Sequence, residues 1–263
     1  MHGHDSVSPV ARVDYTGRAD AYARSRNLPE AVLTEWAAAI NRLLLPQAGM
    51  VLDLGAGPGG FLDALAEWSG ASVVAIEPSP AMRARAGESG LVHRYPYVAA
   101  VAEGLPLASG SIDWVWLSTV IHQVDDLDQA AGEVARVLRP DGCVLIRGFF
   151  SDVPLTGLLA NFPGSERSAR AFPSTARIAD AFRAAGLPLQ DVVDVVEPWV
   201  WDLPTWVARV RALRDTDSAC RPLTDSEVDE GIRRVTASHA AGEPLRSDGT
   251  IRLLCLRRAG RRA

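Results

Sequence analysis

The sequence contains no lysine, because all 27 of its basic residues are arginines. A chain without lysine cannot form a Schiff base with a carbonyl substrate or with pyridoxal phosphate, and it cannot supply the lysine of a Walker A loop. Arginine stays protonated in proteins, so any general base must be His, Asp, Glu, Tyr or Cys. The same absence removes the Tyr-x-x-x-Lys machinery of many small Rossmann reductases.

Cysteine is also scarce, with Cys143, Cys220 and Cys255 far apart in the 263 residues. An odd number at these spacings indicates neither a disulfide framework nor a CxxC zinc site. We therefore interpret them as small buried hydrophobic residues and predict no metal centre.

Long apolar runs and excess positive charge are missing as well. No run is long enough to cross a bilayer, and the N-terminal stretch MHGHDSVSPVARVD lacks the apolar core of a signal peptide. We expect a cytoplasmic protein with no membrane partner. The net charge of -5 argues against nucleic acid as a partner, because neutralising phosphates requires a basic face. The oligomeric state cannot be deduced from the sequence.

From about residue 46 the chain alternates between apolar strand patterns and helical patterns. Predicted strands cover 50–54, 72–77, 97–101, 111–121, 143–150, 189–201 and 250–258, and predicted helices cover 61–68, 80–89, 127–138, 174–187, 203–215 and 225–238. Such alternation predicts an α/β fold with a mostly parallel, doubly wound sheet. We expect one domain over 1–263, with a helical arm at 10–45, a core at 46–150 and a substrate-side elaboration at 151–263.

The stretch VLDLGAGPGG, residues 51–60, joins the first strand to the first helix through four glycines. Gly55, Gly57 and Gly60 satisfy the spacing G-x-G-x-x-G, which several nucleotide cofactors share. Asp53 lies just before the glycines, where a carboxylate favours a cationic ammonium or sulfonium group over a pyrophosphate. Glu77 ends the second strand, where it can accept hydrogen bonds from the ribose hydroxyls of either NAD or S-adenosylmethionine.

Four blocks in order resemble class I S-adenosylmethionine-dependent methyltransferases of the small-molecule type that includes the ubiquinone and menaquinone enzymes. They are VLDLGAGPGG, VVAIEPSPAM, VAEGLPLASGSIDWVWLSTVIHQVDD and VLRPDGCVLI. The resemblance covers residues 12–150 well and the remainder loosely. It implies a Rossmann-like methyltransferase fold, a seven-stranded sheet with an antiparallel last strand, and S-adenosylmethionine as the cofactor.

The resemblance also implies where the cofactor contacts lie. The methionine and ribose side is assigned to Gly55, Ala56 and Gly57, the ribose hydroxyls to Glu77, the adenine faces to Pro78 and Met82, the adenine edge to Ala102 and Glu103, and the ammonium to the carbonyl of Ser118. The family often has an aspartate before the Ala-Glu pair, but this chain has Val101 there, and Glu103 is the nearest alternative acceptor.

The N-terminal segment YTGRADAYARSR also fits this family, in which a Tyr-rich first helix covers the cofactor. Tyr15, Tyr22 and Arg26 are the candidates for this contact. An amphipathic helix with two half-buried tyrosines explains the same pattern, so both interpretations stay open.

Two features bear on the acceptor. His122 follows the fourth strand, beside the expected methyl-transfer point, and its unperturbed pKa of ~6.5 suits a general base. A histidine that only shapes the pocket wall is the alternative. Trp199, Trp201 and Trp206 cluster in EPWVWDLPTW. We favour packing of the inserted helices for this cluster over a flat wall for an aromatic substrate.

These observations predict methyl transfer to a small molecule, an aromatic or apolar natural-product intermediate, with O-, N- and C-methylation all open. A second step after methylation, such as cyclisation, is not excluded. The alternatives are an NAD-dependent oxidoreductase and a non-catalytic S-adenosylmethionine-binding protein.

Overall fold

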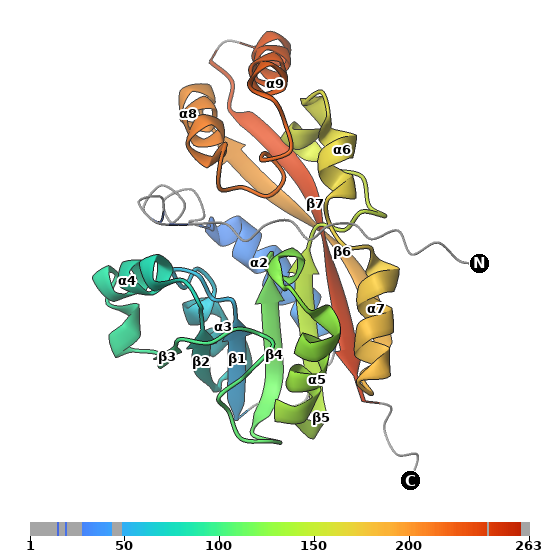
Figure 1. Cartoon of the computed structure of the whole chain (residues 1–263). Coiled ribbons are helices and arrows are strands. Elements are labelled where there is room, and N and C mark those ends of the chain that lie inside the picture. Colours follow the sequence, from blue (N-terminus) through green and yellow to red (C-terminus); the bar gives the residue numbers. More distant parts are fainter. Residues whose placement is uncertain (1–14, 16–18, 20–27, 44–48, 241, 259–263) are drawn as a thin grey trace, which may run out of the picture.

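The computed structural model describes residues 15, 19, 28–43, 49–240 and 242–258. Seven strands form one sheet in the order β3-β2-β1-β4-β5-β7-β6 (Figure 1). Their bounds are β1 Met50–Leu54, β2 Ser72–Ile76, β3 Tyr97–Val98, β4 Ile112–Ser118, β5 Leu138–Gly148, β6 Leu189–Trp201 and β7 Leu245–Arg257. Strands β1 to β5 are parallel, and β7 runs antiparallel to both β5 and β6. The predicted seven-stranded, mostly parallel sheet is confirmed.

Helices cover both faces of this sheet (Figure 1). Their bounds are α2 Glu30–Arg42, α3 Leu62–Ser69, α4 Pro80–Glu88, α5 Leu127–Val137, α6 Ser165–Arg170, α7 Thr175–Ala184, α8 Leu203–Leu213 and α9 Asp225–Ser238, with short 3-10 turns η1 Leu91–His93, η2 Ile121–Gln123 and η3 Gly157–Asn161. Residues of α2 and α3 pack with one face of the sheet, and residues of α5 and α7 pack with the other.

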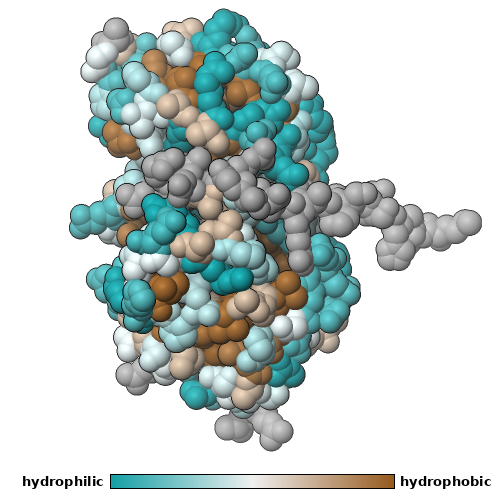
Figure 2. All heavy atoms as spheres, turned by 60° about the vertical axis from the view of Figure 1, so that its left-hand side comes forward, coloured by the Kyte–Doolittle hydropathy of each residue, from teal (hydrophilic) through white to brown (hydrophobic). Residues whose placement is uncertain are grey.

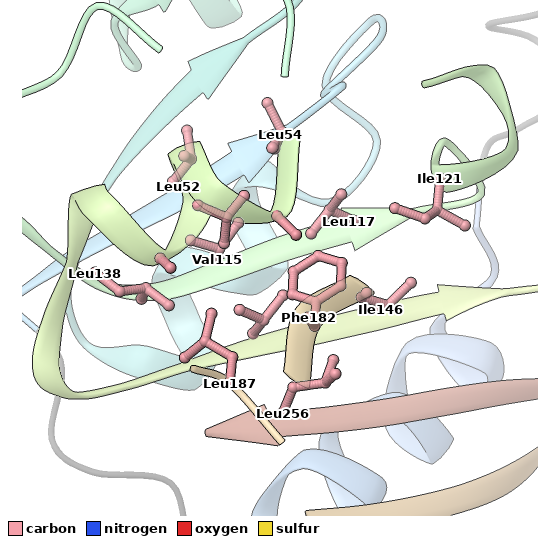
Figure 3. Packing of buried hydrophobic residues seen from close by; sticks show 14 of the residues in the cluster. Leu52, Leu54, Val115, Leu117, Ile121, Leu138, Ile146, Phe182, Leu187 and Leu256 are labelled. Carbon is pink, nitrogen blue, oxygen red and sulfur yellow. The ribbon is translucent and has the colours of Figure 1, made fainter. Parts of the chain in front are cut away.

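The core between the sheet and helices α5 and α7 is built from the apolar residues that alternate along the strands (Figure 3). Leu52, Val115 and Ile146 come from three neighbouring parallel strands, and Phe182 reaches them from α7. All four are almost completely buried. Burial of such side chains stabilises the fold by roughly 1.5–3 kcal/mol each, and it fixes the strand ends at which the loops of the site begin.

A second lobe, here called the cap, stands on the far ends of β6 and β7 (Figure 1). Helices α6, α8 and α9 surround these strand ends. The cap has its own small core, made of Phe162, Trp206, Val210, Leu223, Val228, Ile232, Val235 and Leu245. Figure 2 shows the cap and the sheet region as two lobes of the surface, with hydrophobic and hydrophilic residues mixed over both.

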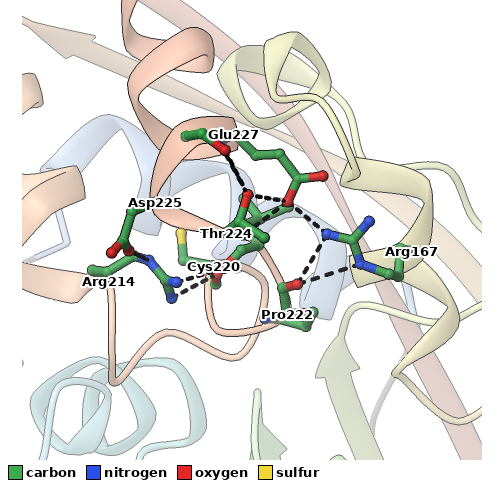
Figure 4. A network of polar contacts seen from close by, with 9 residues as sticks. Arg167, Arg214, Cys220, Pro222, Thr224, Asp225 and Glu227 are labelled. Carbon is green, nitrogen blue, oxygen red and sulfur yellow. Dashed lines mark hydrogen bonds and ion pairs between the residues drawn. The ribbon is translucent and has the colours of Figure 1, made fainter.

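Polar contacts fix the loop between α8 and α9 (Figure 4). Arg167 donates to the carbonyl of Pro222 at 3.0 Å and to the carboxylate of Glu227 at 2.6 Å. Thr224 and Glu227 form a capping box that begins α9. Arg214 binds the carbonyl of Cys220 at 3.3 Å. The loop is therefore held by Arg167 of α6 and by Arg214, which directly follows α8.

Several boundaries differ from the sequence predictions. The third strand, predicted over 97–101, covers only Tyr97–Val98, and the helix predicted over 174–187 covers Thr175–Ala184. The fourth strand was predicted to run to residue 121 but ends at Ser118, because Thr119 takes a φ of 53° and turns the chain. The fifth strand begins at Leu138, through residues predicted as a turn. The last strand begins at Leu245 rather than residue 250, because its first residues pair with the end of β6 in the cap.

Candidate active site

The glycine turn after β1 leaves its backbone open to a ligand. Gly55 and Gly57 both have positive φ, 78° and 56°. A Cβ on Gly55 would lie 2.4 Å from Cγ2 of Val120, so glycine is needed there for close packing. A Cβ on Gly57 would meet no atom within 4 Å, because it would enter the cavity itself. The turn is therefore held by packing on one side and exposed to a cavity on the other.

Glu77, just beyond β2, is fixed by two backbone donors. Its Oε2 accepts from the N–H of Gly57 and its Oε1 from the N–H of Ser79, both at 2.8 Å. Burial raises the pKa of Glu77, while these two hydrogen bonds and the nearby Arg83 act in the opposite direction. Each carboxylate oxygen retains a further acceptor position, and Glu77 lines a cavity. The structure thus places Glu77 beside the glycine turn, and its predicted contact with the ribose hydroxyls stays a prediction.

Asp53 in β1 is more deeply buried, at 3% exposure. Burial, followed by the negative charge of Glu77, raises its pKa to about 8. Its side chain nevertheless lines a cavity beside the glycine turn. A buried acid with a raised pKa at a cavity wall favours a cationic ligand group, which would restore its ionised form.

Two cavities meet at the carboxyl ends of β1 and β4. The first is about 350 Å³ and the second about 730 Å³. Four residues line both of them, namely Gly55, Gly57, Ser118 and Thr119. Thr119 is the one non-glycine with positive φ among the residues that the structure describes. Strained backbone conformations cluster at ligand sites, so the strain of Thr119 favours a binding function for this junction.

The smaller cavity brings together the residues predicted for the adenine and ribose. Pro78, Met82, Ala102, Glu103 and Tyr15 all line it, together with Glu77. Ala56 instead lines the larger cavity. Glu103 also has a structural task, since its Oε1 accepts from the backbone N–H of Asp125 at 2.8 Å and of Asp126 at 3.2 Å. Its assignment to the adenine edge stays a prediction.

Tyr15 is the part of the predicted arm contact that the structure describes. It is buried, and its hydroxyl accepts a weak hydrogen bond from Nε2 of Gln123 at 3.4 Å. Tyr22 and Arg26 lie outside the described residues.

The larger cavity lies between the glycine turn and the cap. Its floor holds an ion pair between Arg147 of β5 and Glu197 of β6, both about 95% or more buried. The Glu197 carboxylate also accepts from Nε1 of Trp36 at 2.7 Å and from Nε1 of Trp199 at 3.0 Å. Arg147 donates to Oγ of Ser118 at 3.0 Å. These contacts hold the pKa of Glu197 below its usual range despite burial, with Arg147 as the main cause.

Sequence reasoning missed Arg147 and Glu197. Both interrupt apolar strand patterns, in the stretches VLIRGFF and VVEPWVW, and both are buried. A charged residue inside such a strand requires a buried partner, and two of opposite sign were available. That signal could have found the pair.

His122 lies in η2 and is 8% exposed. Its Nε2 is 2.6 Å from Oγ of Ser218, which belongs to the loop between α8 and α9. Its ring meets Phe172 edge to face at 5.1 Å. His122 is not among the described residues that line either cavity. The structure therefore shows a histidine that joins the cap loop to the end of β4, and the base role stays a prediction.

The tryptophan cluster divides into two parts. Trp206 packs in the core of the cap, as predicted, although it also reaches the larger cavity. Trp199 and Trp201 lie on β6, line the larger cavity and stack on each other. Trp199 also packs against the core on one face of the sheet, and Trp201 packs against the core of the cap. The predicted packing role and the cavity-wall alternative therefore both describe these two residues.

Within the described residues, no helix is long and apolar enough to span a membrane, and no group of three His, Cys, Asp or Glu side chains could hold a metal ion.

Comparison with known proteins shows which family the region around the glycine turn resembles. Residues 52–146 match a family described as "Methyltransferase domain". A dimethylglycine N-methyltransferase of Parasynechococcus marenigrum is 39% identical over 103 residues, 38% of this chain and 37% of that protein. Methyltransferase GfsG of Streptomyces halstedii is 33% identical over 166 residues, 59% of each chain. The chain thus matches about two-fifths to three-fifths of the length of these relatives.

A solved structure shows the same fold over most of the chain. It is a putative methyltransferase from an antibiotic biosynthesis pathway of Anabaena variabilis, with a TM-score of 0.64 at 22% identity, covering 88% of this chain and 98% of that one. Together, the family match, the sheet topology and the glycine turn identify residues 52–146 as a class I S-adenosylmethionine-dependent methyltransferase domain.

Proposed function

We propose that this protein transfers a methyl group from S-adenosylmethionine to a small-molecule acceptor, an aromatic or apolar natural-product intermediate. One observation carries the proposal: the two cavities meet at Gly55, Gly57, Ser118 and Thr119. A donor whose nucleoside occupies the smaller cavity would present its methyl group to the larger one.

The residues at this junction fit the cofactor. The space beside Gly57 is empty and can hold a ligand group. A side chain at this position would occupy the same space. Glu77 is aligned to accept from the ribose hydroxyls, and Met82 supplies an apolar surface for adenine. Asp53 lies on the side of the larger cavity, where its raised pKa favours a cationic partner. The carbonyl of Ser118 is the proposed acceptor for the ammonium group.

When bound, the cofactor supplies an electrophilic methyl group and a good leaving group. The protein has to align the acceptor in line with the carbon–sulfur bond and to exclude water. The strand ends at Ser118 and Arg147 hold one side of the reaction point, and the cap covers the other. An acceptor that is already an amine or an oxyanion needs no protein base, and for other acceptors His122 is the proposed base.

The comparisons support a small-molecule acceptor only in outline. The relatives include a dimethylglycine N-methyltransferase and the methyltransferase GfsG, and the structural neighbour is described as coming from an antibiotic biosynthesis pathway. The negative net charge supports the absence of a nucleic-acid substrate. These points favour natural-product metabolism, and the acceptor atom stays open among O, N and C.

Calorimetric titration tests the donor assignment. S-adenosylmethionine is expected to bind to the wild-type protein, and NAD is not. Glu77→Ala should weaken binding strongly, because it removes the ribose acceptor. Glu88→Ala is the matched control, since Glu88 ends α4 at the surface, paired with Arg85. Tight binding of NAD without S-adenosylmethionine would support an oxidoreductase instead.

Incubation with S-adenosylmethionine labelled in its methyl group and a metabolite extract of the source organism tests transfer. The labelled product would identify the acceptor. Binding of the cofactor without any labelled product would favour a non-catalytic binding protein.

A further inference from the structure

Trp199 and Trp201 form an aromatic wall on the cap side of the larger cavity. They lie two residues apart on β6, so their side chains share one face of the strand. Their ring centroids are 5.0 Å apart, and their planes differ by only 6°. Both residues line the cavity. Two parallel stacked rings cover each other's facing sides, so the pair offers a ligand its ring edges and the outer face of the stack.

This wall is fixed in place by its neighbours. Nε1 of Trp199 donates to Oε2 of Glu197 at 3.0 Å. The guanidinium carbon of Arg209, on α8, lies 5.6 Å from the Trp199 ring centroid and 5.0 Å from that of Trp201. A cation at this distance from an aromatic ring is attracted by it. The indoles are therefore held on one side by β6 and on another by α8, and a ligand does not have to order them.

Short residues of β7 lie beside the wall. In the pairing of β6 with β7, Trp199 is opposite Ser247 and Glu197 is opposite Gly249. Paired residues of neighbouring strands point to the same face of a sheet. The turn η3 packs on this part of β7: the N–H of Leu158 donates to Oγ of Ser247 at 3.3 Å, and a Cβ on Gly157 would lie 2.7 Å from the same oxygen. Leu158, Ser247 and Gly249 all line the cavity, so η3 bounds the wall on the side of β7.

The wall is connected to the reaction point by a short chain of contacts. Trp199 binds Glu197, Glu197 pairs with Arg147, and Arg147 binds Oγ of Ser118 at the end of β4. Ser118 lines both cavities. The orientation of the wall is therefore fixed relative to the place where the methyl group would be presented.

We propose that Trp199 and Trp201 form the acceptor subsite, and that it takes a planar, conjugated ring system rather than a flexible apolar chain. This inference rests on the proposed function. A rigid ring loses little conformational entropy on binding and can extend a preordered stack of parallel rings, whereas an alkyl chain must freeze several bonds. The electron pair that forms the new bond to the methyl carbon is a lone pair on an O or N attached to the ring, or a π pair of a ring carbon. The carbon–sulfur bond breaks, its electron pair stays on sulfur, and the proton of the acceptor atom, where it has one, passes to solvent.

Binding of two probes tests the subsite without knowledge of the natural acceptor. A hydroxyflavone is a flat phenol of three rings, and 1-decanol is a flexible apolar alcohol. Each is titrated by calorimetry into wild-type protein saturated with S-adenosylhomocysteine. The flavone is expected to bind at least about tenfold more tightly than decanol. Equal affinity for the two probes, or tighter binding of decanol, would overturn the proposal.

Substitutions then locate the binding. Trp199→Leu and Trp201→Leu should each weaken flavone binding by roughly tenfold, which corresponds to about 1.4 kcal/mol. Trp199→Phe keeps a ring but loses the bond to Glu197, so its loss should be smaller. Trp68→Leu is the matched control, because Trp68 lies on α3, packs against Phe61 and is outside the described lining of the cavity.

The affinity for S-adenosylhomocysteine is measured for every variant. Unchanged affinity shows that the variant is folded and that its donor site is intact. Unchanged flavone binding in both leucine variants would refute the subsite while leaving the proposed methyl transfer standing. Failure of the wild-type protein to bind S-adenosylhomocysteine would instead refute the proposed function, and this inference with it.

Discussion

Binding of S-adenosylmethionine near pH 7 is expected to release close to one proton from Asp53. Burial and the charge of Glu77 raise the pKa of this carboxyl to about 8 in the free protein. A group with that pKa is ~90% protonated at pH 7. The cofactor carries a sulfonium and an ammonium group, and a positive charge beside a carboxyl favours its ionised form. The proton held by Asp53 should therefore leave when the cofactor binds.

The same shift sets the pH dependence of affinity. Ionising a carboxyl one unit below its pKa costs about 1.4 kcal/mol, so affinity should rise up to about tenfold between pH 7 and pH 9. The stability of the free protein follows the opposite trend. The pKa of an unperturbed aspartate is 3.8, and that of Asp53 in the folded protein is about 8. The folded state thus binds more protons than the unfolded state between these values, and its stability falls as pH rises from about 4 to about 8.

Calorimetry in buffers of different ionisation enthalpy counts the released protons. For the wild-type protein at pH 7, the observed binding enthalpy plotted against the ionisation enthalpy of the buffer should have a slope near 0.9 protons. The slope should approach zero above pH 9. Asp53→Asn should remove the slope. Asp63→Asn is the control, because Asp63 also lines the cavity but is exposed and paired with Arg94. A buffer-independent heat in the wild type, or an equal slope in Asp53→Asn, would refute the reasoning.

Further predictions concern the turn, the buried ion pair, a helix cap and the candidate base. Gly57→Ala places a methyl group in the cofactor cavity at a positive φ, so cofactor affinity should fall well beyond the loss in stability seen by denaturation. Arg147→Met leaves Glu197 buried without its cation and should cost ~3–5 kcal/mol in urea unfolding, with much of the loss recovered by adding Glu197→Leu. Thr224→Ala removes the capping box of α9 and should cost ~0.5–2 kcal/mol in the same assay. His122→Ala should slow methylation of an identified acceptor at neutral pH while leaving cofactor affinity unchanged, and unaltered turnover would remove the base role.

The donor side of the molecule could be predicted from the sequence because its determinants are local. The glycine turn requires positive φ at Gly55 and Gly57, which only a few residues can adopt, and the sequence displays this directly. Glu77 follows one strand and one helix later, at a spacing that parallel pairing of β1 and β2 brings beside the turn. The remaining strands and helices of the core could be predicted from the periodicity of their apolar residues.

The extent of the last strand could not be predicted in the same way. Residues 245–249, LRSDG, are polar and contain a glycine, which is typical of a turn. They are extended because each pairs with a residue at the end of β6, away from the main core. Local propensity gives no indication of a strand whose stability comes from its partner.

The acceptor side depends on contacts between residues far apart in the chain. Trp36, Arg147 and Glu197 come from α2, β5 and β6, and they meet across β7, which lies between β5 and β6 in the sheet. Their ion pair costs desolvation, and an apolar replacement of similar volume is often at least as stable. A buried pair that contributes little net stability, yet binds a cavity tryptophan on one side and the end of β4 on the other, is better explained by positioning.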